Sequence, residues 1–141
     1  MHNRVILKFD SKSENEQLAR TCISAIMLPI NPSVSELGDV KTAVSEAVTN
    51  AIVHGYPDSC GEVTVEVDLN RERIHITVKD EGVGIENTKE ALEPFFTTKA
   101  EQERAGMGFT IMKTFMDEFR IESQINKGTR VYLTKKFYRE K

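Results

Sequence analysis

The sequence contains no tryptophan, two cysteines and four prolines among its 141 residues. Two cysteines are too few for a disulfide framework, so Cys22 and Cys60 are interpreted as reduced thiols. No apolar run is long enough to cross a membrane, and the apolar run in the N-terminal sequence MHNRVILKFD is too short for a signal peptide. We therefore expect a cytoplasmic protein with no membrane contact.

No charge of one sign dominates the composition either. The formal net charge is −3, from 19 Lys and Arg against 22 Asp and Glu. Proteins that bind nucleic acid through general electrostatics carry a basic excess, so this balance argues against direct nucleic-acid binding. No repeat, low-complexity segment or linker divides the chain, and its length suits one hydrophobic core. We expect a single domain over residues 1–141.

Hydrophobic periodicity predicts three helices and five short strands. Ser-x-x-Glu patterns at 13–16 and 33–36 predict capping boxes for the first two helices, which end before Pro29 and at about Gly55. The apolar face of the first helix is predicted from Leu18, Ala19, Cys22, Ile23 and Ile26. The strands are predicted at 5–9, 63–69, 74–78, 119–123 and 129–137, and the third helix at 109–119. Neighbouring strands joined as hairpins indicate an α+β sandwich, not a parallel βαβ sheet.

The stretch SEAVTNAIVHG raises the first question about function. Glu46, Asn50 and His54 recur every four residues, so on a helix they form one polar stripe beside an apolar face. A carboxylate close to a core is costly unless something pairs with it. A polar helix edge at the border of the sheet is the plain structural alternative, and His54 is interpreted as structural.

Two glycine-containing stretches follow later in the chain. In DEGVG, Asp80 ends a predicted strand before Gly82 and Gly84, which fits either a turn or an acceptor for a base amino group. In AGMGF, Gly106 and Gly108 directly precede the predicted third helix. Backbone N–H groups at such a helix start favour a phosphate, although a flexible loop end explains the pattern equally well.

Together the motifs are much more specific than each is alone. A helix with E-x-x-x-N, a strand ending in D-x-G-x-G, a charged loop, G-x-G and a terminal hairpin with Gly128-Thr129 occur in this order. This order resembles the nucleotide-binding fold shared by DNA gyrase, heat-shock protein 90 and histidine kinases. The resemblance implies a two-layer sandwich with a mixed, mostly antiparallel sheet, helices on one face, and an ATP lid at about 85–108.

Longer blocks narrow the resemblance. SENEQLAR, SEAVTNAIVHGY, DEGVGI, FFTTKAEQERAGMGFTIMKTFMDEF and NKGT are similar to the sporulation anti-sigma F factor family, which the sequence resembles over nearly its whole length. Members of that family are homodimeric serine kinases that bind ATP or ADP with Mg²⁺. They also sequester a sporulation sigma factor and phosphorylate an anti-anti-sigma factor. The 57–73 hairpin and the C-terminal tail depart from the family pattern.

The resemblance implies a role for each matching residue. Glu46 would be the general base, Arg104 would meet the γ-phosphate, and Asn50 would hold Mg²⁺. The nucleotide-binding residues would be Asn50, Asp80, Gly82, Gly84, Thr97, Thr98, Lys99, Gly106, Met107, Gly108 and Thr129. Arg20 and Glu16 on the first helix would contact partner proteins.

Three other functions remain open from the sequence. A histidine kinase catalytic domain normally adjoins a helical hairpin with a phospho-acceptor histidine, and none of the three histidines lies in one. A nucleotide-gated binding module would keep Asn50 and Asp80 and have no use for Glu46. A general-stress anti-sigma kinase would share the chemistry and differ in its partner.

Overall fold

The computed structural model describes residues 1–85 and 100–138, and of residues 100–106 only the backbone. The elements in chain order are β1 (His2–Asp10), α1 (Glu14–Met27), the short 3₁₀ turn η1 (Leu28–Ile30), α2 (Val34–Asn50), the π-helical turn η2 (Ala51–Gly55), β2 (Glu62–Asn70), β3 (Arg73–Asp80), α4 (Ala100–Phe115), β4 (Glu118–Gln124) and β5 (Gly128–Lys136). The five strands form one sheet in the order β1-β2-β3-β5-β4.

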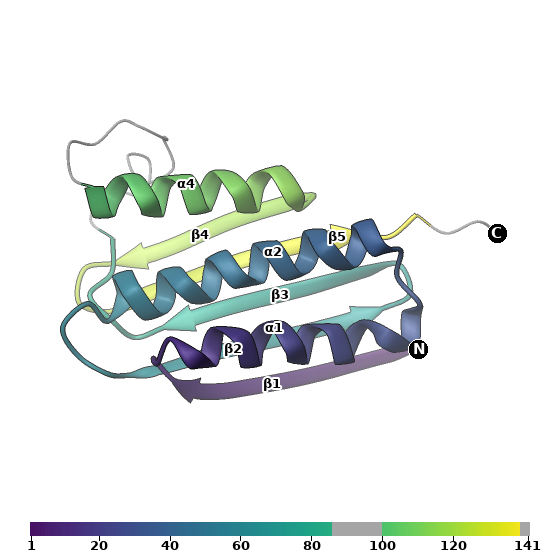
Figure 1. Ribbon diagram of the computed structural model, residues 1–141, viewed down its shortest axis with the longest axis horizontal. Helices are drawn as coiled ribbons and strands as arrows, with labels where there is room; N and C mark the ends of the chain where they lie inside the picture. Colours follow the sequence, from purple (N-terminus) through teal and green to yellow (C-terminus); the bar gives the residue numbers. More distant parts are fainter. Residues whose placement is uncertain (86–99, 139–141) are drawn as a thin grey trace.

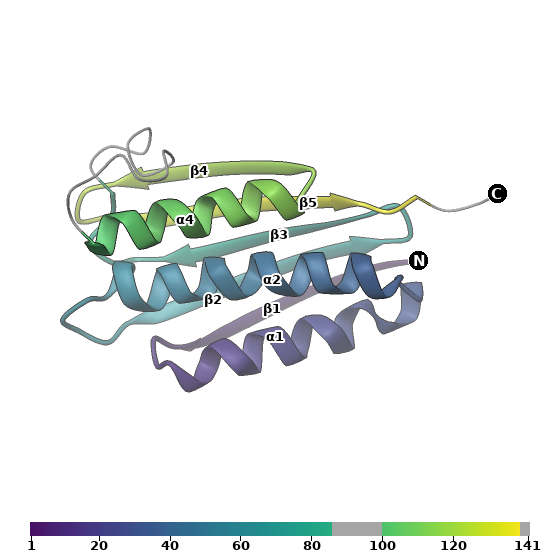
Figure 2. The same cartoon turned by 45° about the horizontal axis from the view of Figure 1, so that its top comes forward.

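The fold has two layers. Figures 1 and 2 show α1, α2 and α4 side by side over one face of the sheet, with α1 nearest β1 and α4 nearest β4. Every strand pair in the described residues is antiparallel, which confirms the α+β class and corrects the expected mixed sheet to a wholly antiparallel one. The physical reason is that β2-β3 and β4-β5 are hairpins, while β1 and β5 each lie antiparallel beside the β2-β3 pair.

The core lies between the helices and the inward rows of the sheet. Strand register places Val65, Val78 and Val131 in one row, and Val67, Ile76 and Leu133 in the next. All six are at least 97% buried. Full burial of such a side chain contributes about 1.5–3 kcal/mol each, so these rows hold the helix layer onto the sheet.

The first helix differs from its prediction in two ways. Its buried stripe is Ala19, Ile23 and Met27, whereas Leu18 is half exposed. Ser13 has helical backbone angles and makes no side-chain cap, because an N-cap needs an extended residue to aim its oxygen at the helix start. Glu16 is turned toward α2 instead, where it accepts a hydrogen bond from Ser45 Oγ.

The second helix confirms its predicted start. Ser33 is extended and accepts from the Glu36 backbone N–H at 3.0 Å, while the Glu36 carboxylate accepts from the Ser33 N–H at 2.9 Å. The helical path reaches Gly55, as predicted, but its last turn is the π-helical η2. This turn directly follows Asn50 of the polar stripe. Single π-helical turns occur frequently at functional sites.

The third helix begins nine residues earlier than predicted and ends at Phe115 instead of residue 119. Residues 100–105, AEQERA, are mostly strong helix formers, so they continue the helix through the two glycines that suggested a loop. Lys135 of β5 fixes its other end, donating from Nζ to the Phe115 carbonyl at 2.9 Å and to Asp39 Oδ2 at 3.0 Å. None of the described helices is both long and apolar enough to cross a membrane.

Candidate functional site

The end of α2 and the end of β3 meet in close backbone contact. A Cβ on Gly55 would lie 2.8 Å from Asp80 Cγ, and a Cβ on Gly82 would lie 1.9 Å from the Gly55 carbonyl oxygen. That carbonyl accepts from the Val83 N–H at 2.9 Å. Glycine is therefore required at both positions, because any side chain would push the π-turn away from Asp80.

Asp80 is the buried acid of this junction. Its side chain is 6% exposed, and its carboxylate accepts a hydrogen bond from the Gly82 N–H at 2.9 Å. Burial raises the pKa of Asp80 to about 6, against the lowering effect of its backbone hydrogen bonds from Gly82 and Thr129. A largely desolvated acceptor held by the backbone is a group prepared to receive a hydrogen-bond donor from a ligand.

A polar row crosses the inward face of the sheet at this end. Asp80 pairs with Thr129 of β5, and Thr129 pairs with Ser123 of β4. Residues directly opposite in antiparallel strands share a face, so the three side chains lie beside one another under the helices. Ser123 and Thr129 are joined through their hydroxyls at 2.7 Å. Gly128 has φ +97°, and a Cβ there would lie 2.0 Å from the Asp80 carbonyl oxygen.

Glu46 and Asn50 face α4 at the position of Gly108. A Cβ on Gly108 would lie 3.1 Å from Glu46 Oε2 and 3.2 Å from Asn50 Nδ2, so glycine lets α4 approach the polar stripe. Burial raises the pKa of Glu46, and the nearby Glu16 carboxylate raises it further. Asn50 Nδ2 is buried without a hydrogen-bond partner in the described residues. An unsatisfied buried amide is rare, and it is consistent with a ligand that binds there.

Glu16 and Arg20 lie on α1 beside this stripe. Glu16 accepts from Ser45 Oγ, the neighbour of Glu46, and its Oε1 is 3.6 Å from Arg20 Nε. The side chains are 22% and 43% exposed, respectively. Arg20 is therefore paired on its own helix and open to solvent, close to the end of α2 that carries the stripe.

The structure thus brings together two groups of predicted residues, Asp80 with Thr129 and Glu46 with Asn50 and Gly108. Gly84 has φ +75°, and a Cβ there would lie 2.0 Å from the Gln124 carbonyl oxygen. The loop after β3 therefore packs closely against the end of β4. Gly106, Met107 and Gly108 lie inside α4, which corrects the expectation that G-x-G precedes a helix. The Arg104 side chain, and Thr97, Thr98 and Lys99, lie outside the described residues, as does most of the expected 85–108 lid.

Sequence reasoning missed Gly55 and Ser123. The sequence marks Gly55 only as the helix end, although its place directly after the polar stripe and ahead of a strand is a usable signal. Ser123 was interpreted as part of a strand without a side-chain role. It alternates with Phe119 and Ile121, which face inward, and a serine in an inward position is the signal that could have found it.

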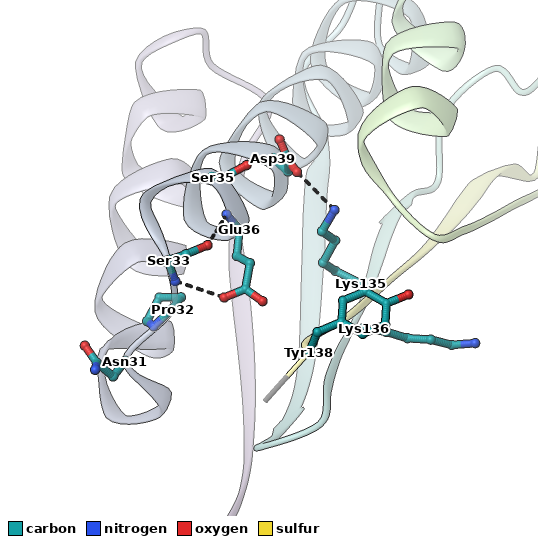
Figure 3. A pocket seen from close by; sticks show the side chains of 9 residues that line it. All are labelled: Asn31, Pro32, Ser33, Ser35, Glu36, Asp39, Lys135, Lys136 and Tyr138. Atoms are coloured by element: carbon teal, nitrogen blue, oxygen red, sulfur yellow. Dashed lines mark hydrogen bonds and ion pairs between the residues drawn. The ribbon is translucent and has the colours of Figure 1, made fainter. Parts of the chain in front are cut away.

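A hollow lies at the opposite end of α2. Its volume is about 490 Å³, and Figure 3 shows its wall, where Ser33 and Glu36 cap the helix and Lys135 reaches Asp39. Its lining is completed by Asn31, Pro32, Ser35, Lys136 and Tyr138. Its most buried charges already pair with each other, so the Asp80 end of the sheet is the better candidate site.

Comparison with known proteins places this geometry in a class. The model of the histidine kinase-like ATPase domain family matches residues 9–135, so the chain is a domain of that class. An anti-sigma F factor from Geobacillus stearothermophilus is 54% identical over 100% of this chain and 97% of its own length. One from Clostridium perfringens is 52% identical over 96% of this chain and 98% of its own. Within the histidine kinase-like ATPase class, the chain belongs to the anti-sigma F factor family.

A solved structure agrees with the fold. The crystal structure of the RsbU and RsbW domains of a Mycobacterium tuberculosis protein matches with a TM-score of 0.68 at 19% identity. It covers 94% of this chain, which spans 31% of that protein chain. At this identity the match supports the two-layer architecture alone.

Proposed function

We propose that this protein is an ATP-dependent serine kinase that also binds a sporulation sigma factor and blocks its use by RNA polymerase. Its kinase substrate is the anti-anti-sigma factor, which phosphorylation inactivates. The observation that carries the proposal is the convergence of Glu46, Asn50 and Asp80 at one end of the fold, in a chain that matches anti-sigma F factors over its full length. We place the protein in the cytoplasm as a homodimer.

The adenine of ATP or ADP binds against the polar row in this proposal. Asp80 accepts a hydrogen bond from the exocyclic amine, with Thr129 beside it. The phosphates extend toward α4, where Gly106, Met107, Gly108 and Arg104 lie on the helix. Gly82, Gly84, Thr97, Thr98 and Lys99 complete the proposed nucleotide site, with the last three on the lid.

A magnesium ion fits the chemistry of the residues present. The Asn50 side-chain oxygen is a hard ligand of the kind that Mg²⁺ accepts, and its amide has no partner for Nδ2 in the described residues. No cluster of three or more His, Cys, Asp or Glu in the described part of the chain could hold a metal. Mg²⁺ usually binds one or two protein groups together with substrate phosphates, so a single Asn is a sufficient protein contribution. When bound, the ion neutralises charge on the transferred phosphoryl group.

Glu46 supplies the proton acceptor. Burial raises the pKa of its carboxyl, and Glu46 Oε2 and Asn50 Nδ2 both face the position of Gly108. Glu46 takes the proton of the substrate serine as the serine oxygen bonds to the γ-phosphorus and ADP leaves. Arg104 stabilises the charge that develops on the phosphoryl oxygens.

Partner proteins dock beside this site through Arg20 and Glu16. Arg20 is exposed enough to meet a carboxylate, and Glu16 connects it to Ser45, the residue before Glu46. A partner held at Arg20 therefore lies close to the catalytic residue. The shared surface explains why substrate and sigma factor would compete.

The test is incubation with labelled ATP, Mg²⁺ and purified partner proteins. We expect transfer of label to a serine of the anti-anti-sigma factor, and ATP-dependent pull-down of the sporulation sigma factor. Glu46→Gln should lower transfer about 10²–10⁴-fold and leave sigma binding intact. Transfer only to a general-stress partner would assign the protein to that pathway. Binding without any transfer would reduce it to a nucleotide-gated binding module.

A further inference from the structure

Ser123 is the residue at which three hydrogen bonds meet at the end of the polar row. Its Oγ accepts from the Ile85 backbone N–H at 2.7 Å, lies 3.1 Å from the Gly128 carbonyl oxygen, and lies 2.7 Å from Thr129 Oγ1. No role for Ser123 follows from the sequence motifs. It belongs to β4, an edge strand of the sheet.

The donor and acceptor roles in this cluster follow from counting protons. A serine hydroxyl has one proton to donate and two lone pairs to accept. The Ile85 N–H can only donate, so it takes one lone pair of Ser123. The three hydrogen bonds can form together in only one arrangement, in which Ser123 gives its proton to the Gly128 carbonyl, because that carbonyl can only accept. One lone pair remains, and Thr129 can meet it only by donating its own proton.

This assignment fixes the direction of the Thr129 hydroxyl. Its proton is committed to Ser123, so toward a ligand Thr129 offers only lone pairs. Asp80, its register partner on β3, is a carboxylate that also accepts. The part of the row formed by these two side chains therefore presents acceptors and no donor.

We propose that Ser123 is a specificity-determining residue, which holds the Thr129 hydroxyl as an acceptor and so denies a hydrogen-bond donor to the carbonyl oxygen of a 6-oxopurine. This inference rests on the proposed function, since it assumes that the base of a purine nucleotide binds at Asp80 and Thr129. Adenine brings an amino group, which two acceptors suit. Hypoxanthine and guanine bring an oxygen at that position, which finds no partner and is rejected.

The hydrogen-bond arrangement predicts how replacing Ser123 changes the preference between nucleotides. In Ser123→Ala the Thr129 hydroxyl is released and can rotate to donate to the 6-oxo group. Binding of inosine triphosphate should improve relative to ATP by about 3–10-fold, the value of one ordinary hydrogen bond. A purely structural defect at this position would weaken both nucleotides together and leave their ratio unchanged.

The experiment measures the affinities of ATP and inosine triphosphate by titration calorimetry on the full chain, for five proteins. Ser123→Ala should raise the affinity for inosine triphosphate relative to that for ATP. Ser123→Thr keeps the hydroxyl and should show the wild-type affinity ratio. The double variant Ser123→Ala/Thr129→Val lacks the Thr129 hydroxyl that Ser123→Ala releases. Its affinity ratio should therefore return toward the wild-type value. Gln124→Ala, which changes the exposed neighbour on β4, is the matched control.

Two results would overturn the inference while leaving the proposed function in place. One is wild-type binding of ATP with an unchanged nucleotide ratio in Ser123→Ala. The other is a changed ratio that Thr129→Val fails to reverse, because Ser123 would then not act through Thr129. Failure of the wild-type protein to bind either nucleotide would remove the proposed function and this inference together.

Discussion

Asp80→Asn tests how much stability the fold gives up to keep a buried acid at its ligand site. Burial raises the pKa of Asp80 from its ordinary value of 3.8 to about 6. A native pKa above the unfolded one means that the folded chain holds its proton more tightly. The free energy of unfolding therefore falls as the pH rises from about 4 through 6, and the full loss is about 3 kcal/mol above that range.

The asparagine variant removes this pH dependence and keeps the shape of the side chain. Its amide oxygen can still accept from the Gly82 N–H, as the carboxylate does at 2.9 Å. Its added N–H groups bring a cost of their own, but that cost does not change with pH. The difference in unfolding free energy between variant and wild type should therefore move in favour of the variant by about 2 kcal/mol from pH 4 to pH 7.5.

Urea unfolding without nucleotide, at several pH values, measures this difference. Asp58→Asn, in the exposed turn before β2, is the control, and its difference should stay within about 0.5 kcal/mol. A difference for Asp80→Asn that is constant with pH, or that favours the wild type more as pH rises, would refute the assignment of Asp80 as a buried carboxyl whose pKa is raised by folding.

Three further predictions concern the rest of the molecule. Arg20→Ala should weaken the binding of both partner proteins at least about fivefold, because Arg20 is exposed on α1, and should leave ATP affinity unchanged, because Arg20 is not among the proposed nucleotide contacts; pull-downs in which only one partner is lost would separate the two docking surfaces. Asn50→Ala should lower Mg²⁺-dependent ATP affinity in calorimetry and leave the thermal midpoint nearly unchanged, since Asn50 Nδ2 has no hydrogen bond in the described residues to lose; equal Mg·ATP affinity would exclude Asn50 as the metal ligand. Gly38→Ala should stabilise the fold by about 0.5–1 kcal/mol in urea, because Gly38 is exposed inside α2 and a Cβ there meets nothing within 4 Å; a lower midpoint would contradict this.

Periodicity predicted most of the helices and strands because each of those elements buries one face. β2 shows this directly, with Val63, Val65, Val67 and Leu69 buried on alternate positions. The start of α4 was missed because its first turns carry glycines, and a glycine in a sequence indicates a loop unless neighbouring packing requires it. A Cβ on Gly108 would lie only 3.1–3.2 Å from Glu46 Oε2 and Asn50 Nδ2 on α2, a close approach between residues about sixty positions apart. Local sequence holds no trace of that contact.

The candidate site also combines residues that local motifs predict with contacts that depend on packing between distant elements. Asp80, Glu46 and Asn50 lie in motifs whose spacing along the chain already suggests their use, and the structure places them at one end of the fold. Glu16 was expected to cap its own helix and to contact partners. Its hydrogen bond to Ser45 depends on how α1 packs against α2, which no local pattern encodes. The lid residues Thr97, Thr98 and Lys99 stay a sequence prediction.

The candidate site lies at one end of the sheet, where the inward row of side chains is polar. Two of its inward rows are wholly apolar, and their burial holds the helices in place. The row of Asp80, Thr129 and Ser123 is polar, and it lies where Gly55, Gly82 and Gly128 let backbones approach closely. A buried acceptor row destabilises the empty protein, and a ligand that donates hydrogen bonds to it recovers that free energy. In the proposed complex, the free energy that the ligand-free protein gives up at this row is returned when a nucleobase donates a hydrogen bond to Asp80.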